Sequence, residues 1–176
     1  GQGGQGTVYR ARDTDLDRIV AIKVIDQPVS GDPGYSDALR REARLAARLD
    51  HPNITTVYDF QLEGDSAYIV MEYVPGLPLK EFCAAQHLTL DQRLRLFIDI
   101  CHGVQHAHSK AVVHRDLKPT NILATLVDGV PRAKIIDFGL AKALGGALTE
   151  MTLVTQQRQI LGTLEYMSPE QARSSG

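Results

Sequence analysis

The sequence has no tryptophan and only two cysteines, Cys83 and Cys101, among its 176 residues. Two cysteines form neither a disulfide framework nor a metal-binding spacing, which fits a reducing cytosol. No apolar run approaches the roughly 18 residues of a membrane span, and no signal peptide is present. We therefore expect a cytoplasmic segment with no membrane span, although a longer parent protein is free to carry an anchor elsewhere.

Strong charge of one sign is also missing. The chain contains 19 Lys and Arg against 21 Asp and Glu, with a net charge of -2 and a pI of about 6.3. Such a balance provides no basic field for nucleic acid or an anionic membrane, so we expect no nucleic-acid partner. The hydrophobic share of 43% is enough for a globular chain with a real core.

The most informative segment that is present runs from His114 to Asn121 and is followed by Asp137-Phe138-Gly139. Phosphoryl transfer needs a carboxylate near the attacking hydroxyl, cations for the phosphates and oxygen ligands for Mg²⁺. Asp116 is the candidate carboxylate and Lys118 the candidate phosphate partner. Asn121 and Asp137 offer the hard oxygen ligands that Mg²⁺ takes. The two motifs together predict a site for moving a phosphoryl group.

A glycine-rich segment opens the chain. Gly1, Gly3 and Gly6 precede Val8 with the spacing G-x-G-x-x-G-x-V, in which residues without a Cβ let backbone amides approach phosphates. The same glycine spacing opens dinucleotide-binding units, but there a helix must follow. Here a strand, a polar turn and a second strand follow, which excludes that class of site.

The second of these strands, residues 19–25, carries Val20-Ala21-Ile22-Lys23. A helix is predicted over residues 36–50, where Glu42 stands on the same face as Leu39 and Ala46. A carboxylate is rarely buried unless it is paired, so Glu42 requires a cation. An arginine of the same helix at the surface is one candidate partner for Glu42.

The pattern changes near the middle of the chain. Before about residue 73, short strands at 7–12, 19–25, 55–60 and 67–73 surround the single helix. After the break at residues 75–78, a short helix is expected at 79–86 and a long one from a capping box at Thr89 to about Lys110. The apolar stripe predicted for the long helix consists of Leu94, Phe97, Ile98, Cys101 and Val104, so Cys101 is expected to fill the core rather than to act as a nucleophile.

These motifs, with Gly162-Thr163 and Ser168-Pro169-Glu170 near the end, stand in one order over the whole chain and resemble eukaryotic-type Ser/Thr protein kinases. The segments 103–108 and 166–172 look like the bacterial subgroup. The resemblance implies an α+β, protein-kinase-like bilobal fold and a partial catalytic domain over 1–176. Its small antiparallel β lobe with one helix would cover about 1–73, and a truncated, mainly helical large lobe about 77–176.

The resemblance also implies roles for particular residues, with ATP and Mg²⁺ as cofactors. Lys23 would grip the α- and β-phosphates, and Glu42 would be its preferred ion-pair partner. Backbone groups of Glu72 and Val74 would bind the adenine edge beside the gatekeeper Met71. The residues that would sandwich the adenine ring are Val8, Ala21 and Leu123. All of these hinge residues also fit ordinary strand core, and the sequence does not choose between the two.

Arg115 precedes the candidate catalytic carboxylate, where its guanidinium would pair with a phosphate on the activation segment. The candidate phosphorylation sites are Thr149, Thr152 and Thr155, of which Thr152 and Thr155 are favoured. Thr163 is expected to have a structural role near the substrate. The alternative is that these threonines are ordinary solvated loop residues.

The expected function is transfer of the γ-phosphoryl group of Mg-ATP to Ser/Thr hydroxyls of a protein substrate, with autophosphorylation through self-association. A pseudokinase that binds nucleotide without turnover, or a small-molecule phosphotransferase, are the alternatives. The long segment from Asp137 to Glu170 favours a protein substrate. Residues 1–176 alone are expected to be inactive and loosely folded, because no later helices cover the apolar stripe of the long helix.

Overall fold

The computed structural model describes residues 2–3, 6–25, 33–64, 66–138 and 164–169. The predicted positions of Gly1, Thr149, Thr152, Thr155 and Thr163 lie outside the described residues. Their roles therefore stay predictions.

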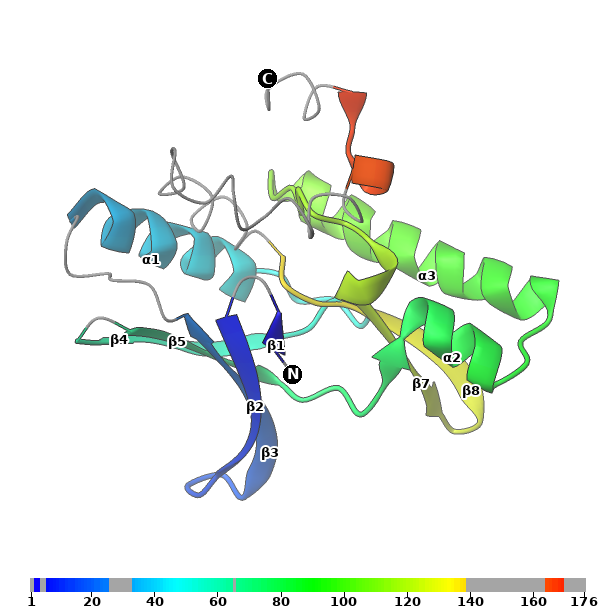
Figure 1. Ribbon diagram of the computed structural model, residues 1–176, viewed down its shortest axis with the longest axis horizontal. Coiled ribbons are helices and arrows are strands. Elements are labelled where there is room, and N and C mark those ends of the chain that lie inside the picture. Colours follow the sequence, from blue (N-terminus) through cyan, green and yellow to red (C-terminus); the bar gives the residue numbers. More distant parts are fainter. Residues whose placement is uncertain (1, 4–5, 26–32, 65, 139–163, 170–176) are drawn as a thin grey trace.

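The N-terminal part is a five-stranded antiparallel sheet in the order β1-β2-β3-β5-β4 (Figure 1). Its strands are β1 (Gln2–Gly3), β2 (Gly6–Asp13), β3 (Arg18–Ile25), β4 (Val57–Glu63) and β5 (Ser66–Glu72). Gly6 has a φ of 118° between β1 and β2, and a Cβ there would collide with the carbonyl oxygen of Val24. Glycine is thus required at this position both by its backbone conformation and by the neighbouring strand.

A single helix, α1 (Pro33–Ala47), lies along the sheet and packs on β4 (Figure 1). Leu39, Ala43 and Ala46 are buried on the face that it turns to the molecule. Leu39 packs in one core cluster with strand residues such as Ile25 and Ile69. The α1 stripe at spacings of three and four predicted this contact.

The C-terminal part contains two helices and a three-stranded sheet in the order β6-β7-β8. Its elements are β6 (Leu77–Pro78), α2 (Leu79–Ala85), α3 (Leu90–Ser109), the 3₁₀ turn η1 (Pro119–Asn121), β7 (Ile122–Val127), β8 (Val130–Ile135) and the 3₁₀ turn η2 (Leu164–Tyr166). The capping box at the start of α3 is confirmed, because the Thr89 amide donates to Gln92 Oε1 at 2.9 Å and the Gln92 amide to Thr89 Oγ1 at 3.4 Å. The two parts give the mixed α+β architecture predicted from the sequence.

The buried face of α3 differs from the predicted stripe. Its buried residues are Leu96, Ile100, Gly103 and Ala107. In contrast, Leu94 and Phe97 are 52% and 62% exposed, and Cys101 is exposed as well. The expectation that Cys101 fills the core is therefore wrong for the described residues.

Close packing of α3 against the sheet explains this difference. A Cβ on Gly103 would lie 3.1 Å from Ile135 Cδ1 and 3.3 Å from the Asn53 carbonyl oxygen. The helix therefore approaches β8 along its face of small residues, because only small side chains leave room for that approach. The larger apolar side chains of the neighbouring face remain at the surface.

The β7–β8 hairpin was not predicted. Asp128 and Gly129 connect its strands with φ angles of 51° and 75°. Two consecutive positive φ angles are typical of a type I′ turn, and Asp-Gly is one of its preferred sequences. This hairpin carries Leu123 on β7 and leads into Asp137, so it supports two of the predicted site residues.

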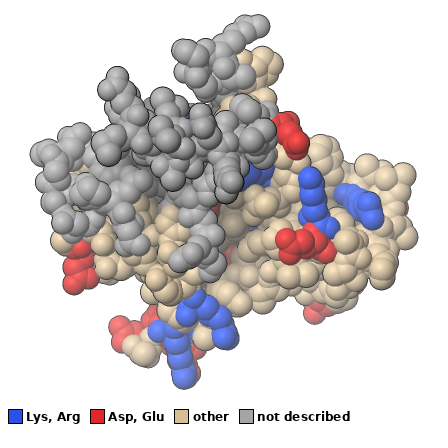
Figure 2. Space-filling view, viewed as in Figure 1, with Lys and Arg blue, Asp and Glu red and all other residues tan. Residues whose placement is uncertain are grey.

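Charged side chains of both signs gather where Figure 1 places the turn between β2 and β3, as Figure 2 shows. Arg12 pairs with Asp17 there, and Arg18 pairs with Asp13 at 3.2 Å. Hydrogen bonds from the Leu16 amide, the Arg18 side chain and the Asp15 amide also lower the pKa of Asp13. Among the described helices, none is long and apolar enough to span a membrane.

Candidate active site

The predicted catalytic segment follows α3 and ends in η1 and β7. Within it, Lys118 Nζ lies 2.9 Å from Asp116 Oδ2. Asn121 Nδ2 donates to the same oxygen at 3.0 Å and to the backbone oxygen of Asp116 at 2.8 Å. One lysine and one amide therefore orient the Asp116 carboxylate, as a positioned catalytic acid or base requires.

Lys23 projects from β3 and is only 2% exposed, although lysine is almost never buried without a partner. Its Nζ lies 3.0 Å from Asp137 Oδ1, just after β8. This ion pair joins the N-terminal sheet to the C-terminal part of the chain. It brings together two of the residues that the sequence assigned to nucleotide and metal binding.

The predicted pair of Lys23 and Glu42 is not formed and is corrected by the structure. Glu42 is largely buried on α1, as expected, but its Oε1 lies 4.0 Å from Arg115 Nη1. Arg115 was expected to bind a phosphate, and here it contacts a carboxylate instead. The reason is geometric, because the Lys23 ammonium is already held by Asp137.

The segment that carries Arg115 and Asp116 is anchored by His114. The His114 ring is buried, its Nε2 donates to the Ile136 carbonyl oxygen at 2.9 Å, and its Nδ1 accepts from the Asp116 amide at 3.3 Å. Phe138 packs edge-on against the ring with centroids 4.7 Å apart. His114 thus links the catalytic segment to the segment of Asp137, a role that the sequence analysis did not assign.

Two backbone positions in this site are strained. Arg115 has a φ of 67° and Asp137 a φ of 62°, in the left-handed region that non-glycine residues rarely adopt. Such conformations cost roughly 1–3 kcal/mol each and persist only where the surroundings enforce them. The His114 hydrogen bonds and the Lys23 ion pair supply that enforcement.

The buried His114 gives a pH-dependent prediction for stability. Burial lowers the pKa of His114 below its ordinary value of 6.5, and burial together with the charges of His106 and His102 lowers the pKa of His51. The unfolded chain therefore binds these protons more readily than the folded chain does. The stabilising contribution is fully present above about pH 6.5 and is lost as the pH falls below that value.

Denaturant unfolding of the complete protein between pH 8 and pH 5 checks this prediction. We expect the free energy of unfolding to fall below about pH 6.5, with at most about 1.4 kcal/mol per pH unit from the proton on His114. The non-titrating His114→Asn variant should show a shallower slope than the wild type. Equal slopes in the two proteins would contradict the assignment to His114.

The predicted hinge residues lie where β5 leaves the sheet. Met71 and Val74 are buried, and Ala21 on β3 stands opposite Met71 in the register. Val8 stands opposite Lys23 on β2, and Leu123 on β7 pairs with Pro78. These positions line up along β2, β3, β5 and β7, while adenine binding by them stays a prediction.

The Glu72 side chain has a partner that the sequence analysis missed. Lys134 on β8 places its Nζ 2.7 Å from Glu72 Oε2, which also accepts from the Thr56 amide at 3.4 Å. The two carbonyl-flanking residues of β8, Ala133 and Ile135, are buried, so alternation along the strand exposes Lys134 on its other face. Recognising the Asp128-Gly129 hairpin signal would have located this lysine.

Replacing Lys134 with alanine is expected to loosen the hinge without unfolding the protein. The pair is only about one quarter exposed on each side, so loss of the cation weakens the anchor of Glu72 beyond what a surface pair would. We expect the KM for ATP to rise about tenfold, which corresponds to about 1.4 kcal/mol. Arg132→Ala on the same strand is the matched control, and an equal effect of both variants would contradict the hinge role.

The donor set fits Mg²⁺ bound together with a nucleotide. Asn121 commits its amide nitrogen to Asp116, which leaves the amide oxygen as its donor to a metal. Asp137 adds a carboxylate, and Mg²⁺ commonly uses one or two carboxylates together with substrate phosphates. Within the described residues no group of three or more His, Cys, Asp or Glu side chains could hold a metal alone, which fits a metal shared with phosphates.

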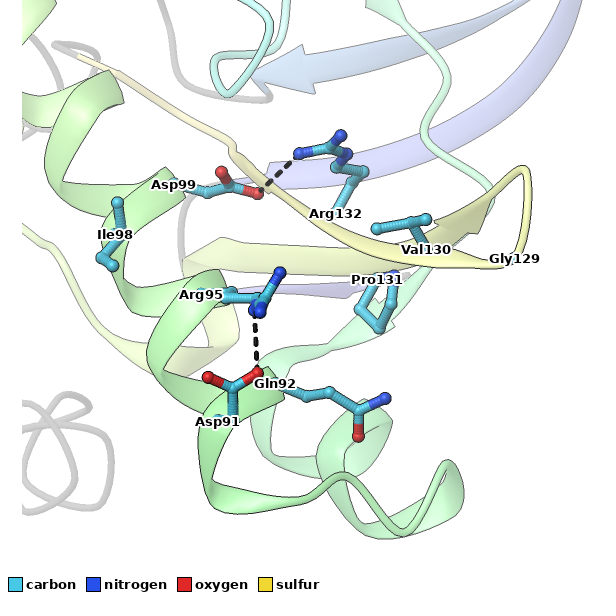
Figure 3. Close-up of a pocket in the computed structure, with 9 residues that line it drawn as sticks. All are labelled: Asp91, Gln92, Arg95, Ile98, Asp99, Gly129, Val130, Pro131 and Arg132. Carbon is cyan, nitrogen blue, oxygen red and sulfur yellow. Dashed lines mark hydrogen bonds and ion pairs between the residues drawn. The ribbon is translucent and has the colours of Figure 1, made fainter.

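A cavity of about 550 Å³ lies away from these residues, between α3 and the β7–β8 turn (Figure 3). Two ion pairs stand on its walls, Asp91 with Arg95 at 2.8 Å and Asp99 with Arg132 at 3.9 Å. It brings together none of the residues of the catalytic segment. Size alone is therefore a poor guide to the active site of this chain.

Comparison with known proteins agrees with this geometry. The model of the protein kinase domain matches residues 1–176. The chain is 44% identical over 174 residues to the serine/threonine-protein kinase PrkC of Bacillus subtilis, covering 98% of the chain and 26% of PrkC. It is 39% identical over 178 residues to the serine/threonine-protein kinase PknB of Mycobacterium leprae, covering 98% of the chain and 28% of PknB.

A solved structure is also similar. The crystal structure of Rad53 residues 1–466 in complex with AMP-PNP matches with a TM-score of 0.68 and 36% identity, over 81% of this chain and 37% of that one. This match confirms the kinase-like fold class. The chain spans about a quarter of the length of the two bacterial relatives. Since the family model matches every residue from first to last, the chain belongs to the protein kinase domain family.

Proposed function

We propose that the protein containing this chain transfers the γ-phosphoryl group of Mg-ATP to Ser or Thr hydroxyls of a protein substrate. The arrangement of Lys118 and Asn121 around the Asp116 carboxylate is the observation that carries the proposal. It holds one carboxylate in place beside a cation, with a metal-type oxygen donor on the same short segment. The relatives named as serine/threonine-protein kinases support the acceptor class.

Each residue has a role in this proposal. Asp116 orients the acceptor hydroxyl and takes its proton, while Lys118 faces the phosphoryl group that moves. Asn121 and Asp137 hold Mg²⁺, which when bound neutralises charge on the phosphates. Lys23 binds the α- and β-phosphates, and backbone groups of Glu72 and Val74 hold the adenine.

The ion pairs described above correspond to a resting arrangement in this proposal. Lys23 and Asp137 must separate before each can bind phosphate or metal, and Glu42 must leave Arg115 to reach Lys23. A phosphate on Thr152 or Thr155 would attract Arg115 and so release Glu42. Autophosphorylation between two copies of the protein is the proposed source of that phosphate.

The Lys23–Asp137 pair also favours a second candidate, a nucleotide-binding scaffold without turnover. In such a protein the pair would persist, because nothing would exchange Asp137 onto a metal. The two candidates differ in turnover and not in nucleotide affinity.

One experiment separates them. The complete protein is first tested for a rise in Tm with Mg-ATP, and then for phosphate incorporation into casein with ATP labelled at the γ-position. We expect both a Tm shift and label on phosphoserine or phosphothreonine. A Tm shift with no label on protein, in samples with and without prior autophosphorylation, would support the scaffold and contradict the kinase.

A further inference from the structure

A groove lies on the N-terminal part of the molecule, between α1 and β4. It encloses a cavity of about 290 Å³. Its apolar lining comes from Ala43 and Ala47 on the helix and from Val57 and Phe60 on the strand. None of these residues has a role in the proposed phosphoryl transfer, so the groove is a separate feature of the fold.

Two arginines stand on the helical side of the groove. Arg40 and Arg44 are four residues apart, so they project from the same side of α1, and both are exposed. Within the described part of the chain neither has an ion-pair partner. Exposed guanidinium groups spaced in this way suit carboxylates, which they bind through charge-assisted hydrogen bonds.

The acidic residue of the groove does not neutralise these arginines. Asp59 Oδ1 accepts from the Phe60 amide at 2.8 Å, and Asp59 Oδ2 accepts from Gln61 Nε2 at 2.9 Å. Both carboxylate oxygens are therefore engaged along β4 itself. The groove combines an apolar floor with a net positive rim, in a chain whose overall charge is -2.

The strand side of the groove suits an extended ligand. β4 is an edge strand in the order of the described sheet, and its pairing with β5 is irregular between Val57 and Asp59. An edge strand leaves one row of main-chain groups able to pair with another chain. Tyr58, which also lines the groove, is held by the Arg18 guanidinium 3.8 Å above its ring.

We propose that this groove binds an extended acidic peptide segment of a partner protein that carries a large apolar side chain. The apolar side chain fills the floor between Ala43, Ala47 and Phe60, and acidic side chains pair with Arg40 and Arg44. Charge complementarity selects the acidic partner, and the edge strand selects an extended one. Since α1 also carries Glu42, an occupant of the groove constrains the helix that supplies this carboxylate; that effect on activity rests on the proposed kinase function, whereas binding does not.

Fluorescence anisotropy with the complete protein tests the proposal, using a fluorescein-labelled synthetic peptide of alternating glutamate and phenylalanine. The double variant Arg40→Glu/Arg44→Glu is expected to bind it at least about tenfold more weakly. The matched control Arg41→Glu/Arg48→Glu makes the same charge change on or beside the same helix but outside the groove lining. It is expected to bind within about twofold of wild type.

Two further measurements test the apolar part and the class of ligand. Ala47→Trp fills the floor without changing charge and should also abolish binding, while a peptide with serine in place of phenylalanine should bind at least about tenfold more weakly. Equal weakening by the two arginine double variants, or equal binding of the serine peptide, would overturn the proposal. Binding of phosphatidylserine vesicles in place of the peptide would overturn it in favour of a lipid surface.

Discussion

Replacing Asp116 with asparagine in the complete protein is expected to lower kcat roughly 10²–10⁴-fold, the range typical of a positioned general base. Asparagine keeps the size of the side chain and an oxygen that can accept from Asn121. It cannot take the proton of the acceptor hydroxyl, and it removes the negative charge that lies 2.9 Å from Lys118 Nζ. Folding and ATP affinity should therefore change little while turnover collapses.

Steady-state phosphorylation of casein, with ATP affinity measured separately, checks this expectation. Asp128→Asn is a suitable control, because Asp128 lies exposed in the β7–β8 turn with a positive φ that asparagine tolerates. This control should keep wild-type kcat. If Asp116→Asn kept a third or more of wild-type kcat, Asp116 would not be the catalytic carboxylate.

Replacing Lys23 with methionine is expected to lower kcat/KM for ATP by about 10²-fold or more, because the phosphates lose the group that positions them. The substitution also removes the cation that lies 3.0 Å from Asp137 Oδ1. Asp137 then has no lysine to restrain it, so metal binding and phosphate positioning are disturbed together. Methionine fills a similar volume at this buried position, so the fold should persist.

Kinetic assays and the Tm of the variant test this prediction, with Lys110→Met as the matched change at an exposed lysine that donates to the Arg48 carbonyl oxygen. The Lys110 variant should retain wild-type kcat/KM. Wild-type kcat/KM in Lys23→Met would show that Lys23 does not bind the phosphates. An unfolded variant would be recognised by its Tm, and Lys23→Arg would then serve as the milder substitution.

Local signals predicted much of this fold. The alternating strands before residue 73, the apolar stripe of α1 and the capping box at Thr89 each depend on residues close together in the chain. The same holds for the catalytic segment, whose Asp116, Lys118 and Asn121 meet within six residues. These features could be predicted because their geometry follows from short-range backbone conformation.

The corrected features depend on long-range choices. Glu42 needed a cation, and the sequence offered several, but only the packing of α1 decided between Lys23 and Arg115. Similarly, α3 has two adjacent apolar faces, and the small side chain of Gly103 decided which face meets β8. The β7–β8 hairpin is different, because its Asp128-Gly129 signal was present in the sequence and was overlooked.

The proposed transfer to a protein hydroxyl is tested most directly by a single-turnover experiment. The complete protein is loaded with ATP labelled at the γ-position and then mixed with Mg²⁺ and a peptide that contains one serine. The proposed function predicts that the label moves to the serine oxygen in one exponential phase in the wild type, and that the phase is lost in Asp116→Asn. Label found only in free phosphate, or equal transfer by the two proteins, would contradict it.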